Sequence, residues 1–140
     1  LGATHCFDSR NNNMVEEIRD LTNGGVDYAI DLAGVIQAMD TAYQIIRYGG
    51  SVVTAGLSPI NTQFSFNHSD LVAQEKSILG SYMGSCVPVR DIPRFLNLYK
   101  QGRLPVDKLI DGKITFDNLN EGFDKLSKGE VVRQILMPNA

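Results

Sequence analysis

Three short stretches of this sequence place small residues directly after an apolar run. They are Asp31-Leu32-Ala33-Gly34, Ala55-Gly56-Leu57 and Ser81-Tyr82-Met83-Gly84. In open α/β sheets, ligands bind outside the carboxyl ends of the strands, and a glycine there has no Cβ to keep a ligand away from the backbone. The stretches therefore predict a crevice for a flat, mostly apolar ligand such as a nucleotide. A plain turn is the alternative at Gly56, and the residues alone leave both interpretations open.

Two charged residues beside apolar runs are further candidates for chemistry. Asp31 could accept a hydrogen bond from a sugar, but we favour a role in capping the helix that follows it. Arg133 lies in a late apolar run, where burying an unpaired cation is costly. Phosphate and carboxylate are both good partners for its planar guanidinium. The alternative is that Arg133 is simply an exposed or salt-bridged arginine. From the residues alone, we favour this alternative over a ligand-binding role.

The remaining reactive side chains form no catalytic or metal-binding pattern. The histidines His5 and His68 stand far apart, and the cysteines Cys6 and Cys86 have no metal-type spacing. No base stands next to Cys86 to activate its thiol. We therefore assign no catalytic residue and no metal site to this chain. Two such cysteines are typical of a reduced, cytoplasmic protein.

Composition narrows the class of protein further. The 140 residues are 43% hydrophobic and 21% charged, as in ordinary globular proteins. The net charge is −3 and no Lys/Arg-rich run occurs, so we expect neither a nucleic-acid nor a membrane partner. No apolar stretch approaches the ~18 residues of a membrane span, and no signal peptide is present. The start, Leu1-Gly2-Ala3-Thr4, resembles a helix running into a strand, so we expect a piece of a longer protein.

The apolar pattern predicts alternating strands and helices that carry the three strand ends. In the first part we expect strands at 5–8, 26–32 and 51–57, a helix from Asp8-Ser9 to 23–25, and a helix from Ile36 closed by Gly49. The run Val52 to Ala55 is apolar throughout, as in strands buried on both faces of a parallel sheet. A β-α-β-α-β order with short connections implies parallel strands and right-handed crossovers.

The pattern changes after Leu57. We expect an edge strand at 62–66, a short helix at 69–74, a strand at 77–83, a helix around 92–99 with Pro93 in its first turn, a turn at 107–110, an extended piece at 113–116, a helix capped by Asp117, and a last strand at 131–137. The G-x-G-x-x-G loop that opens a dinucleotide-binding fold does not occur in the chain. Without that loop, a pyrophosphate has no glycine-rich helix N-terminus here.

Several blocks are similar, in order and spacing, to one known family. The blocks are Leu1–Thr4, Gly24–Tyr28, Gly49–Val53, Ser81–Ser85, Arg90–Arg94, Leu119–Asp124 and Gly129–Arg133. Over nearly its whole length the chain resembles the zinc-dependent medium-chain alcohol dehydrogenases, especially the class III-like branch with its thiol-linked formaldehyde-oxidising enzymes.

The resemblance implies that this chain is the C-terminal part of such an enzyme. Residues 1–85 would form a partial NAD-binding Rossmann domain, an α/β parallel sheet with flanking helices that lacks the first β-α-β unit. Residues 86–140 would form helices and a strand that return to an absent catalytic domain. The phosphate loop, the acidic ribose-binding residue, the catalytic zinc ligands and the structural zinc lobe would all lie outside the chain.

The resemblance also implies contacts with NAD. The assigned residues are Leu32 and Ala33 on the adenine side, Ala55, Gly56 and Leu57 at the nicotinamide, Ser81 and Met83 at its carboxamide, and Arg133 at the pyrophosphate. The last assignment reverses the preference for a surface arginine. Val35 stands where some members carry a basic residue, so we expect no ionic contact there.

The implied activity is the interconversion of small-molecule alcohols and aldehydes by hydride transfer to or from NAD, with zinc polarising the oxygen. We expect the isolated chain to be inactive, and a homodimer or tetramer to form through the edge strand Ser77 to Met83, with 62–66 as a second candidate. Two alternatives remain open: a zinc-independent NADPH quinone reductase of the same superfamily, and a non-catalytic oligomerisation module with unpaired sheet edges. A methyltransferase-like Rossmann domain is a poorer option, because the block from Ser81 to Arg94 argues against it.

Overall fold

The computed structural model describes residues 2–139, and the chain divides into two compact units. One unit is Thr4–Cys86, and the other is formed mainly by Val87–Ala140. No helix within residues 2–139 is both long and apolar enough to cross a membrane.

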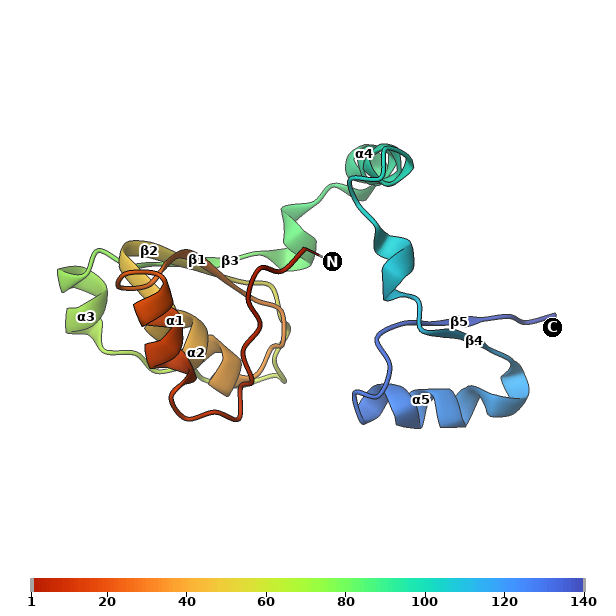
Figure 1. Cartoon of the computed structure of the whole chain (residues 1–140), viewed down its shortest axis with the longest axis horizontal. Coiled ribbons are helices and arrows are strands. Elements are labelled where there is room, and N and C mark those ends of the chain that lie inside the picture. The colour runs from red at the N-terminus through yellow and green to blue at the C-terminus, as the bar shows by residue number, and fades with distance from the viewer. Residues whose placement is uncertain (1, 140) are drawn as a thin grey trace. The chain divides into compact units, whose positions relative to one another are not determined.

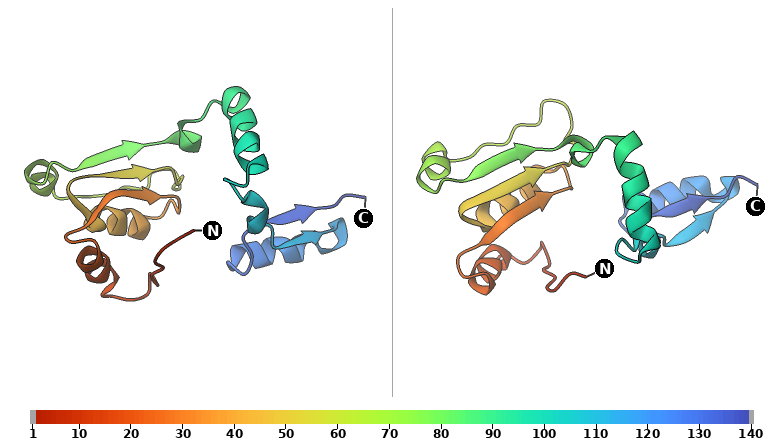
Figure 2. Two further views of the ribbon diagram at one scale, coloured as in Figure 1. Left: turned by 45° about the horizontal axis from the view of Figure 1, so that its top comes forward. Right: turned by 90° about the horizontal axis from the view of Figure 1, so that it is seen from above.

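Three parallel strands form the sheet of the first unit. They are β1 (Val26–Asp31), β2 (Ile46–Thr54) and β3 (Ser77–Gly80), in the order β1-β2-β3 (Figure 1). The helices of this unit are α1 (Met14–Leu21), α2 (Ile36–Ile45) and α3 (His68–Ala73). Figure 2 shows the three strands side by side with α2 lying against them. The predicted α/β class with a parallel sheet and flanking helices is confirmed.

The core of the first unit lies between α2 and the strands β1 and β2. Its buried apolar side chains are Ala29, Met39, Ala42, Tyr43, Ile46 and Val52. Full burial of a side chain such as Val52 contributes about 1.5–3 kcal/mol to the stability of the fold. The burial of Val52 agrees with the prediction that its apolar run forms the central strand. Phe64 and Phe66 add an aromatic edge to this core, since both rings lie within 6.3 Å of the Tyr43 ring, centroid to centroid.

The helix α2 runs into β2 without a turn, because Ile46 is already extended (φ −72°, ψ 142°). The last carbonyls of a helix need other donors, and two cations supply them. Arg19 donates to the carbonyls of Gln44 at 2.9 Å and Ile46 at 3.2 Å, and Lys76 donates to the carbonyl of Tyr43 at 3.1 Å. Burial, and to a lesser extent the charge of Arg19, lower the pKa of Lys76.

Two predicted strands of the first unit are absent. Residues 5–8 and 62–66 form neither helix nor strand. A strand persists only when its backbone groups pair with a neighbour, and neither segment pairs with a strand among residues 2–139. In residues 62–66, the alternation that resembled a strand instead places Phe64 and Phe66 together on Tyr43.

The other strands are shifted from their predicted bounds. The central strand begins at Ile46 and ends at Thr54, and β3 ends at Gly80 rather than Met83. After β3 the chain forms a short turn, Tyr82–Ser85, in which Met83 and Gly84 have left-handed dihedral angles. A left-handed residue cannot continue a strand, so the strand stops before it.

The second unit contains a two-stranded parallel sheet and its connecting helix. Its elements are α4 (Pro88–Lys100), a turn at Val106–Leu109, β4 (Gly112–Ile114), a turn at Phe116–Asn118, α5 (Leu119–Ser127) and β5 (Gln134–Leu136). β4 pairs with β5 from Gly112 opposite Gln134 to Ile114 opposite Leu136 (Figure 1).

Three details of the second unit differ from prediction. Pro88 occupies the start of α4, so Pro93 lies inside the helix and not in its first turn. Asn118, not Asp117, precedes α5, because Thr115 and Asn118 form a reciprocal capping pair around the turn before it. The last strand is only three residues long, so Arg133 lies just before it.

Candidate functional site

The three strands of the first unit end level with one another. Asp31, the last residue of β1, is paired in register with Thr54 of β2, and Thr54 is paired with Gly80 of β3. The next residues of each chain segment therefore leave the sheet along one edge. Seven of the eight predicted cofactor residues lie in these segments: Leu32, Ala33, Ala55, Gly56, Leu57, Ser81 and Met83.

Asp31 joins the ends of β1 and β2. Its carboxylate accepts hydrogen bonds from the backbone N–H groups of Ala33 (2.9 Å) and Gly34 (3.4 Å) and from the Thr54 hydroxyl (2.9 Å). Its backbone carbonyl accepts from the N–H groups of Ala55 and Gly56. The predicted helix cap is therefore wrong, because Val35 precedes α2 and offers no side-chain cap; Asp31 holds the loop before the helix instead.

Two glycines let the loops after β1 and β2 touch. A Cβ built on Gly56 would lie 2.2 Å from the Gly34 nitrogen, and one built on Gly34 would lie 2.7 Å from the Leu57 carbonyl oxygen. Gly34 also has a φ of +67°, which favours glycine. The Ser58 hydroxyl donates to the Gly34 carbonyl at 2.7 Å. Gly56 is therefore required for close backbone contact, so it does more than form a plain turn.

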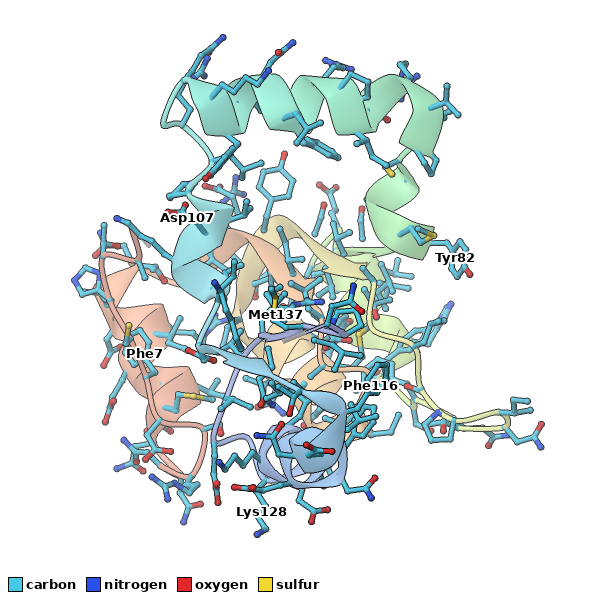
Figure 3. The ribbon with its side chains drawn as sticks, turned by 90° about the vertical axis from the view of Figure 1, so that its right-hand side faces the viewer. Phe7, Tyr82, Asp107, Phe116, Lys128 and Met137 are labelled. Carbon is cyan, nitrogen blue, oxygen red and sulfur yellow. The ribbon has the colours of Figure 1, made fainter. Side chains whose placement is uncertain are left out.

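The end of β3 carries a strained turn. The Ser81 N–H donates to the Thr54 carbonyl at 2.9 Å, which keeps Ser81 at the same sheet edge. Met83 and Ser85 both have positive φ, at 50° and 54°, a conformation that costs roughly 1–2 kcal/mol per residue for side chains other than glycine. The Ser81 and Ser85 hydroxyl oxygens lie 3.1 Å apart and tie the turn together. Tyr82 extends outward from it (Figure 3).

A hollow of about 860 Å³ lies along β1 and α2. Leu32 and Ala33 line it, together with Tyr28 and Ile30 of β1 and Val35 before α2. Leu32 is 74% exposed, so it is open to a ligand. A cavity of this kind, apolar with few polar groups, is typical of small-molecule sites.

Arg133 belongs to the second unit and is described apart from the other seven residues. It is exposed and has no ion pair among residues 2–139. Its backbone is held by Asp111, whose carboxylate accepts from the Val132 and Arg133 N–H groups. It also lines a hollow of about 380 Å³ with apolar residues such as Phe123 and Leu126. Arg133 is therefore an exposed surface arginine in this chain, as the simpler of the two interpretations predicted.

The described residues contain no group of three metal-ligating side chains. Cys6 is exposed, Cys86 is half-buried, and both are free thiols. A catalytic zinc usually takes three protein ligands, so residues 2–139 do not fit such an ion by themselves.

Comparison with known proteins identifies the family. Residues 1–101 match the model of the zinc-binding dehydrogenases. The chain belongs to this family. Among curated relatives, it is 32% identical to the NDMA-dependent alcohol dehydrogenase of Amycolatopsis methanolica over 144 residues, covering 100% of the chain and 38% of that protein. It is 31% identical to alcohol dehydrogenase 1 of Cenchrus americanus over 139 residues, covering 97% and 36%.

Solved structures of the zinc-binding dehydrogenases have the same fold. Benzyl alcohol dehydrogenase from Acinetobacter calcoaceticus superposes with a TM-score of 0.90 at 30% identity, covering 96% of this chain and 37% of that one. A zinc-binding dehydrogenase from Sinorhizobium meliloti 1021 bound to NADP gives 0.82 at 27% identity, covering 98% and 40%. The resemblance seen in the sequence is confirmed, and the chain spans well under half the length of these relatives.

Sequence reasoning missed the role of the pair Asp31 and Thr54. Each is the last residue of its strand. A hydrogen-bonding side chain at the end of two successive apolar strands was the available signal, but only the register shows that the two side chains meet.

Proposed function

We propose that this chain provides one side of the dinucleotide site of an alcohol dehydrogenase, and that the protein containing it interconverts alcohols and aldehydes by hydride transfer to or from NAD. The observation that carries the proposal is the common edge at which the three strands end, where Gly34 and Gly56 bring two backbones into contact. Membership of the zinc-binding dehydrogenase family supports it. Bound NAD supplies the hydride acceptor; the chain's own residues bind and orient it.

Each half of the cofactor has its own segment of the crevice in this proposal. Leu32 and Ala33, beside the 860 Å³ hollow, receive the adenine side. Ala55, Gly56 and Leu57 receive the nicotinamide, and the backbones of Ser81 and Met83 receive its carboxamide. Arg133 belongs to the other unit, and its assignment to the pyrophosphate rests on the family resemblance alone.

Zinc chemistry in this proposal depends on ligands other than residues 2–139, because those residues contain no group of three suitable side chains. We therefore expect the 140-residue chain alone to bind cofactor weakly and to show no turnover with NAD and a short alcohol. Steady turnover by the pure chain would contradict this expectation.

The test of the proposed site is a titration of the isotope-labelled chain with NADH, followed by amide chemical shifts. We expect the largest shifts at Leu32, Ala33 and Ala55 to Leu57, with little change at α3, which does not line the 860 Å³ hollow. An even spread of small shifts, or shifts confined to α3, would count against the proposal.

Two alternatives keep specific support. The NADP in the zinc-binding dehydrogenase of Sinorhizobium meliloti supports only the cofactor of the first alternative, the zinc-independent NADPH quinone reductase. Titration with NADPH beside NADH separates the two cofactors. The free outer sides of β1 and β3 favour a non-catalytic oligomerisation module.

We also propose that the protein forms a homodimer or tetramer through β3. We further propose a cytoplasmic location, which the two free thiols support.

A further inference from the structure

We propose that Asp31 is a positioning residue of the dinucleotide site. Its carboxylate fixes the distance between the adenine-side segment after β1 and the nicotinamide-side segment after β2. The inference rests on the proposed function, since it concerns how that same site binds a whole dinucleotide.

The first step is the burial of the Asp31 carboxylate. Asp31 is only 5% exposed, and it has no cationic partner among residues 2–139. Burying a charge is costly unless hydrogen bonds compensate it. The compensation comes from Ala33, Gly34 and Thr54, all of them at the crevice. The buried carboxyl group is therefore held by hydrogen bonds from residues at the strand ends.

The second step is the direction of these hydrogen bonds. The two N–H donors belong to the segment after β1, and the hydroxyl donor belongs to the last residue of β2. One carboxylate thus connects the segment after β1 to the strand end from which the segment after β2 begins. Hydrogen bonds to a charged acceptor are stronger than neutral ones, so the connection resists stretching.

The third step is the contact that the carboxylate controls. Gly34 and Gly56 pack backbone to backbone without room for a Cβ on either. If the carboxylate is removed, the N–H groups of Ala33 and Gly34 lose their acceptor, and the loop carrying Gly34 is free to move away from Gly56. The backbone bonds from Ala55 and Gly56 to the Asp31 carbonyl and the bond from Ser58 to Gly34 remain, so each segment keeps its own shape, but their separation is held less tightly.

The consequence is specific to a ligand with two joined halves. A dinucleotide gains affinity over its halves only when both subsites are held at the separation that the ligand spans. A mononucleotide touches one segment and is insensitive to that separation. Loss of Asp31 should therefore weaken NADH much more than it weakens either half.

The test measures the affinity of the full chain for NADH, AMP and reduced nicotinamide mononucleotide by amide-shift titration. For Asp31→Ala we expect NADH affinity to fall about tenfold and the affinities of both halves to change less than about twofold. Asp31→Asn should recover most of the loss, because an amide oxygen still accepts from the Ala33 N–H. Asp40→Ala, an exposed aspartate of α2 away from the crevice, is the matched control and should change nothing.

Each other outcome is decisive. If the unsubstituted chain binds NADH and Asp31→Ala binds it equally well, the inference fails while the proposed function stands. If all three ligands weaken alike, Asp31 merely supports the fold and the inference is again wrong. If the unsubstituted chain shows no NADH shifts at the crevice, the proposed function fails and the inference with it. If Asp31→Ala does not fold, Thr54→Val takes its place, because it removes one hydrogen bond of the same carboxylate. The affinities of Thr54→Val for NADH and for the two halves are then compared in the same way.

Discussion

At the scale of single residues, the molecule depends on a few positions where only one residue type fits. Gly56 is the clearest, because any Cβ there would collide with the backbone of Gly34 and Ala33, which cannot rotate away as a side chain can. Gly80, at the end of β3, is a contrast: a Cβ on it would meet nothing within 4 Å. Two glycines at strand ends thus have different physical reasons to be present.

This contrast gives a prediction for stability. Gly56→Ala should lower the free energy of unfolding by about 1–3 kcal/mol, since one methyl group must force two backbones apart. Gly80→Ala, the matched control, should stay within about 0.5 kcal/mol of the original chain. Urea unfolding followed by circular dichroism measures both. Equal stability of the two variants would show that the glycine contact is not a close one.

At the scale of elements, the most unusual feature is the junction between α2 and β2. A helix commonly ends in a glycine with positive φ, but here the chain turns from helix to strand at Ile46. Arg19 from α1 and Lys76, the residue before β3, supply the missing donors. The Lys76 ammonium also lies 4.6 Å from the centre of the Tyr43 ring, so it binds the helix end in two ways.

Lys76→Met tests this joint, because it keeps an apolar stem and removes the donor. We expect a loss of about 1 kcal/mol in the free energy of unfolding, the usual contribution of a hydrogen bond. Glu16→Gln, a loss of one charge on the exposed side of α1, serves as the control and should have almost no effect. Thermal unfolding of the two variants at one pH provides the comparison, and a Lys76→Met chain as stable as the original would rule out a capping role.

At the scale of the whole molecule, both outer strands of the three-stranded sheet have a side that pairs with no strand among residues 2–139. β3 is short, and its Leu79 is exposed. Unpaired edges readily add another strand, and two copies that meet through the same edge form a closed dimer. This supports the proposed association through β3, whereas the second predicted interface at 62–66 has no strand to offer.

Sedimentation velocity over a range of concentrations tests the association. We expect the chain to dimerise, and Leu79→Lys to shift the equilibrium toward the monomer, because a charge would be buried beside the partner's strand. Leu21→Lys, with the same change at an exposed leucine of α1, should leave the dimer intact. A monomer at every concentration, or equal weakening by both substitutions, would contradict the proposed interface.

The sequence by itself determined the class of fold and the family. The apolar run around Val52, the helical spacing of Met39 and Tyr43, and the glycines after the strands are local signals, because each depends on residues that are neighbours along the chain. These signals placed β1 and the start of α2 correctly and located the three strand ends, whereas α2 ends and β2 begins several residues earlier than predicted. The similarity of several blocks to zinc-binding dehydrogenases added the family, which the comparisons confirm.

The tertiary structure decided what depends on partners distant in the sequence. Residues 62–66 alternate like a strand but pair with nothing among the described residues, so pairing overrides the local pattern. Asp31 resembled a helix cap, yet its carboxylate meets Thr54, 23 residues away, because the register of two parallel strands brings them level. A local pattern fixes which residues suit an element, whereas hydrogen bonds between elements fix which of them meet.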